Sequence, residues 1–200
     1  MKKRIFDLII VLSLLPVLLP ILILIYILVR VNLGKPVFYS SQRPGLDCKP
    51  FKMFKFRTMT NTQDEFGSLL PDKERTTNFG NFLRMSSLDE LPETWNVIKG
   101  EMSLVGPRPL LMEYIELYDK KQIKRHSVLP GITGLAQING RNSISWEKKF
   151  KYDLLYVKNQ SLTLDIKILF LTIYKVIKKD GIYSNDEAIV TKFTGNKNKN

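Results

Sequence analysis

The hydrophobic and polar positions separate an apolar N-terminal segment from a mixed remainder. No charged residue occurs between Leu8 and Val29. A helix over this segment is about 33 Å long at about 1.5 Å per residue, roughly the thickness of a bilayer core. Pro16 and Pro20 lie in its middle, where each removes a backbone donor, so the pattern predicts a kinked membrane helix.

Positive charge flanks this segment on both sides. Lys2, Lys3 and Arg4 precede it, and Arg30 and Lys35 follow it. Because positive flanks favour the cytoplasmic side, we predict a re-entrant helix that enters and leaves the bilayer by one face. A single span with a proline kink is the alternative. A cleaved signal peptide fits less well, because the apolar run is too long and no small-residue cleavage site follows it.

Two segments after the anchor are predicted to be short strands, Gly34 to Tyr39 and Phe51 to Arg57, around a turn at Arg43 to Asp47. The second segment alternates apolar residues with cations, which indicates a solvated strand face or a basic surface. The cations expected near this surface are Lys52, Lys55 and Arg57. The polar stretch 61–78 contains Gly67 and Pro71 and is predicted to be a mobile loop.

Helical patterns fill most of the remaining sequence. Leu88 to Lys99, followed by Gly100, predicts a helix with a glycine stop. Asp89 is expected at or next to its N-cap, because that frame places Pro92 in the first turn, where its missing donor does no harm.

Further helices are expected nearer the C-terminus. They span Met112 to Arg125, and Phe150 to Lys179 with a break at 159–161. The second half of the latter mixes apolar residues with lysines, which fits a cationic helix on a membrane or a buried core helix. The Asn/Lys-rich end is expected to be a disordered tail.

Together these elements predict a mainly helical α+β fold. Its parts are a re-entrant membrane helix (1–33), a small cytoplasmic domain with a short β-hairpin and amphipathic interfacial helices (34–194), and a disordered tail (195–200). The net charge of +12 indicates polyanionic partners such as lipid phosphates, nucleotides or nucleic acid. Cys48 is the only cysteine, so no intrachain disulfide can form, and a cytoplasmic face is favoured.

Asp89 and Glu90 are the candidate chemical groups. Acids at a helix start usually act as caps and first-turn residues, and the helix dipole keeps them ionised. An ionised carboxylate can also attack phosphorus or hold Mg²⁺, and Arg84 and Arg108 lie near in sequence as phosphate partners. His126, the only histidine, is expected at a solvated helix end without a catalytic role. No P-loop, dinucleotide fingerprint or Asp-x-Asp motif occurs.

Several long segments resemble the monotopic bacterial phosphoglycosyl transferases, and the short chain with residues 145–150 is most similar to members that initiate N-linked protein glycosylation. The matching segments are RMSSLDELP (84–92), WNVIKGEMSLVGPRP (95–109), FKFRTM (54–59) and PGITGLAQINGRN (130–142). The resemblance implies transfer of a sugar phosphate from a UDP-sugar to undecaprenyl phosphate, with release of UMP. An N-acetylated sugar such as N,N'-diacetylbacillosamine is one candidate donor sugar.

The resemblance also assigns roles to individual residues. It makes Asp89 the nucleophile that forms an aspartyl-phosphosugar intermediate and a ligand of the Mg²⁺ cofactor. Glu90 is the second member of the acidic pair. The residues expected to bind phosphates, nucleotide or other parts of the substrates are Lys55, Arg57, Arg84, Arg108, Gln137 and Arg141.

Family members are anchored at the cytoplasmic face of the bacterial inner membrane by a helix broken at Ser-Pro. Here the matching pair is Leu19-Pro20, so that serine is absent. The partners expected from the resemblance are a UDP-sugar, undecaprenyl phosphate and inner-membrane lipids, with no nucleic acid. The rival hypothesis is a non-enzymatic, basic, membrane-tethered protein that binds anionic lipid or nucleic acid by charge. It leaves the acidic pair unexplained.

Overall fold

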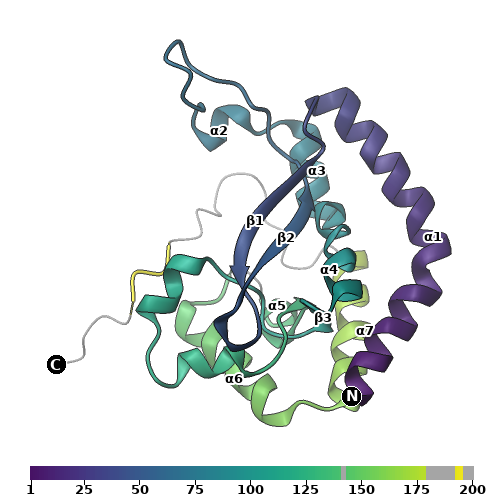
Figure 1. The fold of residues 1–200 in the computed structure, drawn as a ribbon, viewed down its shortest axis with the longest axis vertical. Helices are drawn as coiled ribbons and strands as arrows, with labels where there is room; N and C mark the ends of the chain where they lie inside the picture. The colour runs from purple at the N-terminus through teal and green to yellow at the C-terminus, as the bar shows by residue number, and fades with distance from the viewer. Residues whose placement is uncertain (141–142, 179–191, 196–200) are drawn as a thin grey trace.

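The computed structural model describes residues 1–140, 143–178 and 192–195. A long N-terminal helix lies along one side of an α+β domain with two small two-stranded sheets (Figure 1). The helices are α1 Lys2–Leu33, α2 Asp72–Arg75, α3 Asn78–Ser86, α4 Glu93–Lys99, α5 Leu135–Ile138, α6 Trp146–Asn159 and α7 Leu162–Lys178. The 3₁₀ helices are η1 Leu46–Cys48, η2 Leu88–Glu90, η3 Met112–Leu117 and η4 Gln122–Ser127, and the strands are β1 Phe38–Pro44, β2 Pro50–Phe56, β3 Ser103–Val105 and β4 Gly131–Thr133.

Helix α1 is uninterrupted, although Pro16 and Pro20 lie inside it. It curves along the domain, and its two ends approach different parts of it (Figure 1). Among the described residues it is the one helix long and apolar enough to cross a membrane. Its middle is largely exposed, and the exposed side chains there include Leu12, Val17 and Leu24. Because exposing so much apolar surface to water costs free energy, this part of the helix is suited to contact with lipid.

The first two turns of α1 are fastened to the domain by polar contacts. Lys3 forms an ion pair with the buried Asp165 of α7, with Nζ and Oδ2 2.6 Å apart. Arg4 donates hydrogen bonds to the last carbonyls of α4, at Val97 and Ile98. The buried carboxylate of Asp7 accepts a hydrogen bond of 2.7 Å from Ser103 Oγ on β3. These bonds hold the start of α1 against the domain.

The last turns of α1 pack against the same domain. Ile25, Val29 and Leu33 are buried with Phe56 and Leu83 in one apolar cluster. Arg57 lies at the end of this contact and donates to the main-chain oxygens of Leu33 and Lys35. Its side chain is 6% exposed, so the expectation of a surface position was wrong. A guanidinium satisfies carbonyls that a helix end leaves without partners, and this explains its burial.

The hairpin confirms the expected strands, but the first strand starts later and extends further than predicted. β1 and β2 are antiparallel, with Phe38 opposite Phe56 and Pro44 opposite Pro50. The predicted turn at 43–47 therefore begins inside β1. After the hairpin, the stretch 61–78 is not a structureless loop, since it contains α2 and the antiparallel bridge between Gln63 and Leu69.

The parallel pair β3–β4 was not predicted, and close backbone packing makes it possible. A Cβ on Gly131 would lie 2.0 Å from the amide nitrogen of Gly106, and one on Gly106 would lie 2.3 Å from Leu129 O. Any larger residue would push the two chains apart. The segment Pro107-Arg108-Pro109 leaves this crossing directly after β3, so the glycines determine where Arg108 emerges.

Two predicted helices differ from the structure. α4 begins at Glu93 with Pro92 as its N-cap, and Asp89 lies before it in η2 without a side-chain capping bond. The glycine stop is confirmed, since Gly100 has φ 82°. In place of one helix over 112–125, two 3₁₀ helices occur, separated at Tyr118, which has extended backbone angles.

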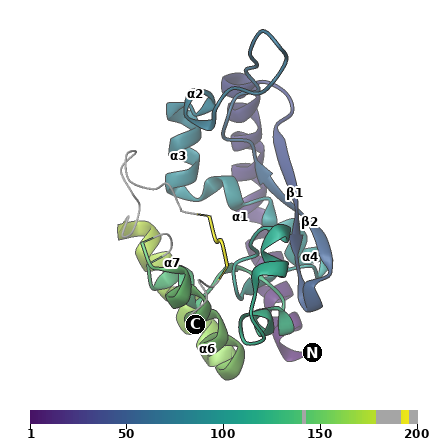
Figure 2. The same ribbon diagram turned by 90° about the vertical axis from the view of Figure 1, so that its left-hand side faces the viewer.

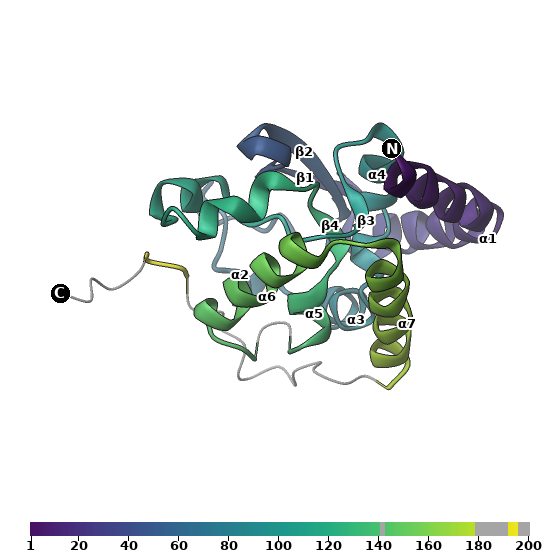
Figure 3. The ribbon, with the colours of Figure 1, turned by 90° about the horizontal axis from the view of Figure 1, so that it is seen from below.

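The helical hairpin α6–α7 confirms the predicted break, since neither Gln160 nor Ser161 belongs to either helix. It lies on the opposite side of the molecule from β1–β2, and α5 packs against both of its helices (Figures 2 and 3). One side of α7 is buried, at Asp165 and Ile168, as the core-helix alternative predicts, whereas Phe170 and Ile173 are exposed. Apart from Gly195, the predicted tail lies outside the described residues.

Candidate active site

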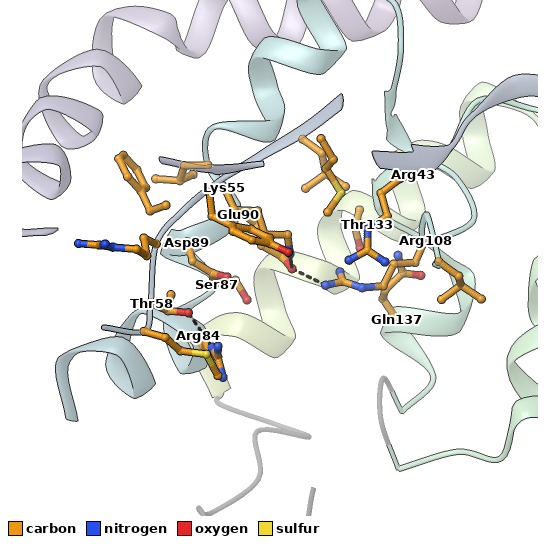
Figure 4. Close-up of a pocket in the computed structure, with 18 of the residues that line it drawn as sticks. Arg43, Lys55, Thr58, Arg84, Ser87, Asp89, Glu90, Arg108, Thr133 and Gln137 are labelled. Carbon is orange, nitrogen blue, oxygen red and sulfur yellow. Dashed lines mark hydrogen bonds and ion pairs between the residues drawn. The ribbon is translucent and has the colours of Figure 1, made fainter. Parts of the chain in front are cut away.

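A cleft of about 880 Å³ lies between the hairpin, η2, the segment after β3, and helices α5 to α7. Seven of the eight predicted site residues line it, although they come from separate parts of the chain. These are Lys55, Arg57, Arg84, Asp89, Glu90, Arg108 and Gln137. All of them except Arg57 are labelled in Figure 4. Arg141, the eighth, lies outside the described residues.

The acidic pair is presented by an abrupt end of α3. Ser87 has left-handed backbone angles (φ 57°, ψ 17°), and its amide donates to carbonyls of the last turn of α3. The chain then enters η2, which carries Asp89 and Glu90. Because left-handed angles cost a non-glycine residue free energy, this turn is a strained point next to the candidate catalytic groups.

Glu90 is ion-paired with two cations. Its Oε1 lies 2.6 Å from Lys55 Nζ and 2.5 Å from Arg108 Nη2. Burial alone would raise the pKa of this carboxyl, but Arg108 and Lys55 outweigh burial and hold the pKa well below its usual range. The charge of Glu90 in turn raises the pKa of Arg108. Glu90 is therefore ionised at neutral pH, and its charge holds the two cations in place.

Asp89 has a different environment from its neighbour. Its side chain is 8% exposed and has no hydrogen bond or ion pair with any residue that the structure describes. Burial and the adjacent Glu90 raise its pKa to about 6, against the opposing effects of Lys55, Arg108 and Arg84. The expectation that a helix dipole keeps it ionised was wrong, because α4 starts four residues later. At pH 7 it is nevertheless mostly a carboxylate whose oxygens are available to a ligand.

Glu93 is a third acid that the sequence analysis missed. It is 2% exposed, and its Oε1 lies 3.2 Å from Lys55 Nζ. Burial and the charge of Glu90 raise its pKa to about 7. The four-residue spacing from Asp89 was the available signal, since it places two acids on one side of a helical turn. Lys55 thus lies between two carboxylates.

The other predicted site residues differ in how many of their polar atoms already form hydrogen bonds within the protein. Arg84 is exposed, and its Nε donates a hydrogen bond of 2.8 Å to Thr58 Oγ1. The guanidinium of Arg57 is engaged with the end of α1, which indicates a structural role. Both amide atoms of Gln137 are buried without a hydrogen-bond partner among the described residues, although the residue lines the cleft. An unpaired buried amide costs free energy unless a ligand or water satisfies it.

A buried ion pair supports the backbone of Arg108. Arg125 of η4 forms hydrogen bonds of 3.0 and 2.8 Å to Asp153 Oδ2 on α6. The same guanidinium donates a 2.6 Å hydrogen bond to the main-chain oxygen of Arg108. Sequence reasoning missed this pair, because its members come from helices that no local pattern brings together.

His126 is not at a solvated helix end, as had been expected. It is 5% exposed, its Nδ1 lies 3.2 Å from Gly45 O, and its ring lies beside that of Tyr118. Burial and the neighbouring Arg125 lower its pKa to about 4, so it is neutral at physiological pH. It joins η4 to the hairpin turn and does not line the cleft.

The acids of the cleft are compatible with magnesium that is bound largely through substrate. No group of three or more metal-ligating side chains occurs in the part of the chain that the structure describes. Mg²⁺ commonly uses one or two carboxylates together with substrate phosphates and water. Glu90 is occupied by cations, whereas Asp89 forms no ion pair in the described part of the chain. The donor set therefore fits a site completed by phosphate oxygens, with Asp89 as its protein ligand.

Comparisons with known proteins identify the family of the chain. The chain is 53% identical over 193 residues to the uncharacterized sugar transferase EpsL of Bacillus subtilis strain 168, covering 96% of each chain. It is 40% identical over 198 residues to the exopolysaccharide production protein ExoY of Sinorhizobium fredii, covering 90% of this chain and 88% of that protein.

A longer relative is the UDP-glucose:undecaprenyl-phosphate glucose-1-phosphate transferase of Klebsiella pneumoniae. It is 43% identical over 183 residues, which cover 86% of this chain but 39% of that protein. The family model described as bacterial sugar transferase matches residues 1–179. The chain therefore belongs to the bacterial sugar transferase family.

Proposed function

We propose that this bacterial sugar transferase moves a sugar-1-phosphate from a UDP-sugar to undecaprenyl phosphate and releases UMP. The observation that carries the proposal is the contrast within the acidic pair: Glu90 is neutralised by two cations, whereas Asp89 lies in a cationic cleft and pairs with none of the residues that the structure describes. An unpaired carboxylate near several cations is suited to attack an anionic phosphorus. The name of the Klebsiella relative supports the same substrate classes.

In the proposed mechanism Asp89 is the nucleophile. A carboxylate oxygen forms a bond to the sugar-bearing phosphorus, and the bond from that phosphorus to the oxygen of UMP breaks. The electron pair leaves with UMP, so no proton is needed at this step. An oxygen of undecaprenyl phosphate then attacks the same phosphorus and releases the carboxylate of Asp89. The product is a lipid-linked diphosphosugar, and the enzyme is regenerated.

The neighbouring residues prepare this reaction electrostatically. Glu90 holds Lys55 and Arg108 beside Asp89, where the two cations can neutralise phosphate oxygens in the transition state. Arg84 supplies a further cation from the end of α3. Because these positions exist before substrate binds, little reorganisation is required when charge develops. Mg²⁺, when bound by Asp89 and the diphosphate, would supply additional charge neutralisation.

The proposed anchoring is re-entrant, with both flanks of α1 at the cytoplasmic face of the inner membrane. It is supported by the contacts at both ends of α1 with one domain, through Lys3 and Asp7 at the start and Val29 and Leu33 at the end. A helix that crossed the bilayer completely would carry one end away from that domain. The exposed Phe170 and Ile173 of α7 offer further apolar surface for lipid.

The product is proposed to start the assembly of an extracellular glycan. The name of the Sinorhizobium relative favours exopolysaccharide assembly over protein glycosylation. The names of the similar proteins include both a glucose-phosphate and a galactose-phosphate transferase. The donor sugar is therefore best identified by testing a panel of UDP-sugars.

A half-reaction tests the covalent mechanism. The purified protein is mixed with UDP-sugar and Mg²⁺ in the absence of lipid, and UMP is measured. We expect a burst of UMP that does not exceed the amount of enzyme, followed by turnover only when undecaprenyl phosphate is added. Asp89→Asn should give no burst, whereas the exposed-acid control Glu116→Gln should behave as wild type.

UMP release that requires lipid from the start would contradict the intermediate and indicate direct transfer. The rival hypothesis of a charge-driven lipid or nucleic-acid binder predicts no UMP release with any UDP-sugar. It also predicts that Asp89→Asn keeps or increases anion affinity, because an acidic charge is removed.

A further inference from the structure

Three cations that line the cleft belong together, because the charge of Arg108 acts on both Arg43 and Lys149. Arg43 comes from β1, Arg108 from the segment after β3, and Lys149 from α6, and all three line the cleft. Figure 4 shows the side chains of Arg43 and Arg108 next to one another, with Glu90 between them and Arg84. The sequence analysis assigned no role to Arg43 or Lys149.

The acids of the cleft do not balance this charge. Glu90 pairs with Arg108, and Asp153 pairs with Arg125. Arg43 donates one hydrogen bond, of 3.2 Å from Nε to Ser41 Oγ, and the Nζ of Lys149 lies 4.3 Å from the ring centre of Trp146. Neither has a carboxylate within 4.0 Å in the described part of the chain.

The two cations are also partly withdrawn from water. Both side chains are half-buried. Burial and the nearby Arg108 lower the pKa of Lys149, and burial, together with Arg108, lowers the pKa of Arg43. Like charges brought together in a half-buried site destabilise the folded chain unless an anion compensates them. The arrangement is therefore more favourable with an anion bound.

We infer that Arg43 and Lys149, together with Arg108, form a phosphate-binding subsite on the opposite side of Glu90 from Arg84. The identity of the ligand rests on the proposed function, in which the cleft accepts two phosphate compounds. The phosphate bound here belongs either to the nucleotide part of the donor or to the lipid acceptor. Guanidinium and ammonium groups from three different elements suit a phosphate, whose oxygens point in several directions.

The test measures binding without turnover. Full-length protein in detergent is titrated with UMP, uridine and a short-chain polyprenyl phosphate. The variants are Arg43→Gln and Lys149→Gln, and the matched controls are Lys52→Gln on β2 and Lys148→Gln on α6, both of which replace exposed lysines. Loss of one charged hydrogen bond should weaken phosphate binding by about tenfold or more.

We expect Arg43→Gln and Lys149→Gln to weaken the binding of the same phosphate ligand. The affinity for uridine should not change, and the control variants should bind all three ligands like wild type. Weaker UMP binding assigns the subsite to the nucleotide, and weaker polyprenyl phosphate binding assigns it to the lipid. Arg43→Lys should restore part of the affinity. If Arg43→Gln does not fold, as judged by circular dichroism, Lys149→Gln decides the question alone.

Unchanged affinity of both variants for both phosphates would overturn the subsite while leaving the proposed function intact. A wild-type protein that binds neither phosphate ligand would overturn both. Kinetics give an independent check, since the variants should raise the KM for one substrate while the burst of UMP at saturating donor remains.

Discussion

Arg125 donates a 2.6 Å hydrogen bond to the main-chain oxygen of Arg108. The bond holds the main chain of Arg108, so the buried side chain of Arg125 determines the point from which the side chain of Arg108 extends into the cleft. Arg125 is in turn held by Asp153. The position of a cation in the cleft therefore depends on a buried ion pair between η4 and α6.

This relationship predicts a large effect of Asp153→Ala on stability. Removing the carboxylate leaves a buried guanidinium uncompensated, which costs about 3–5 kcal/mol of the free energy of unfolding. Denaturant unfolding in detergent, followed by circular dichroism, measures the loss. The double variant Arg125→Met/Asp153→Leu should recover much of it, because no unpaired charge remains. An Asp153→Ala variant as stable as wild type would contradict the role of the pair.

Asp89→Asn should be inactive but more stable than wild type at neutral pH. The folded-state pKa of Asp89 is raised from 3.8 to about 6, so ionising it opposes folding. This difference corresponds to about 3 kcal/mol at a pH above both values. The gain should be small near pH 4, increase as the pH rises to about 6, and remain constant beyond. Equal stability of the two proteins at pH 8 would show that the surroundings of Asp89 do not destabilise its ionised carboxylate.

The rate of the first half-reaction should increase with pH and reach half its maximum near pH 6, because only ionised Asp89 can attack. Arg84 lowers the pKa of Asp89, so Arg84→Met should move the midpoint to higher pH. Rapid-quench measurements of the UMP burst give this profile. Glu93, with a pKa of about 7, is a second group that titrates nearby, and Glu93→Gln serves as its control. If the rise in rate near pH 6 disappeared in Glu93→Gln, the assignment of this titration to Asp89 would be wrong.

Both flanks of α1 should be inaccessible from outside the cell. After Cys48→Ser, single cysteines are placed at the exposed positions Lys2 and Lys35. A membrane-impermeant thiol reagent should label neither site in intact cells and both after lysis. The two substitutions spare the Lys3–Asp165 ion pair, so the packing of α1 is preserved. Labelling of one flank in intact cells would demonstrate a complete span.

Local sequence patterns determined the elements that depend on neighbouring residues. The apolar run predicted a helix, although α1 extends beyond it at both ends, the alternation around Phe54 predicted β2, and Gly100 ended α4, because hydrophobic periodicity and backbone preference act over a few residues. The long motifs around Asp89 and Arg108 identified the family, which the match over residues 1–179 shows. The family and the candidate catalytic acids could therefore be predicted from contiguous sequence motifs.

Only the tertiary structure decided the environment of each charge. Glu90 and Asp89 are neighbours in sequence, yet Glu90 is ion-paired with Lys55 and Arg108 from other segments, whereas Asp89 pairs with no residue that the structure describes. Likewise Arg57 is buried at the end of α1, and Arg43 and Lys149, far apart in sequence, line the same cleft as Arg108. Burial and charge pairing depend on contacts between residues far apart in the chain, and these set a pKa value and the availability of a group to a ligand.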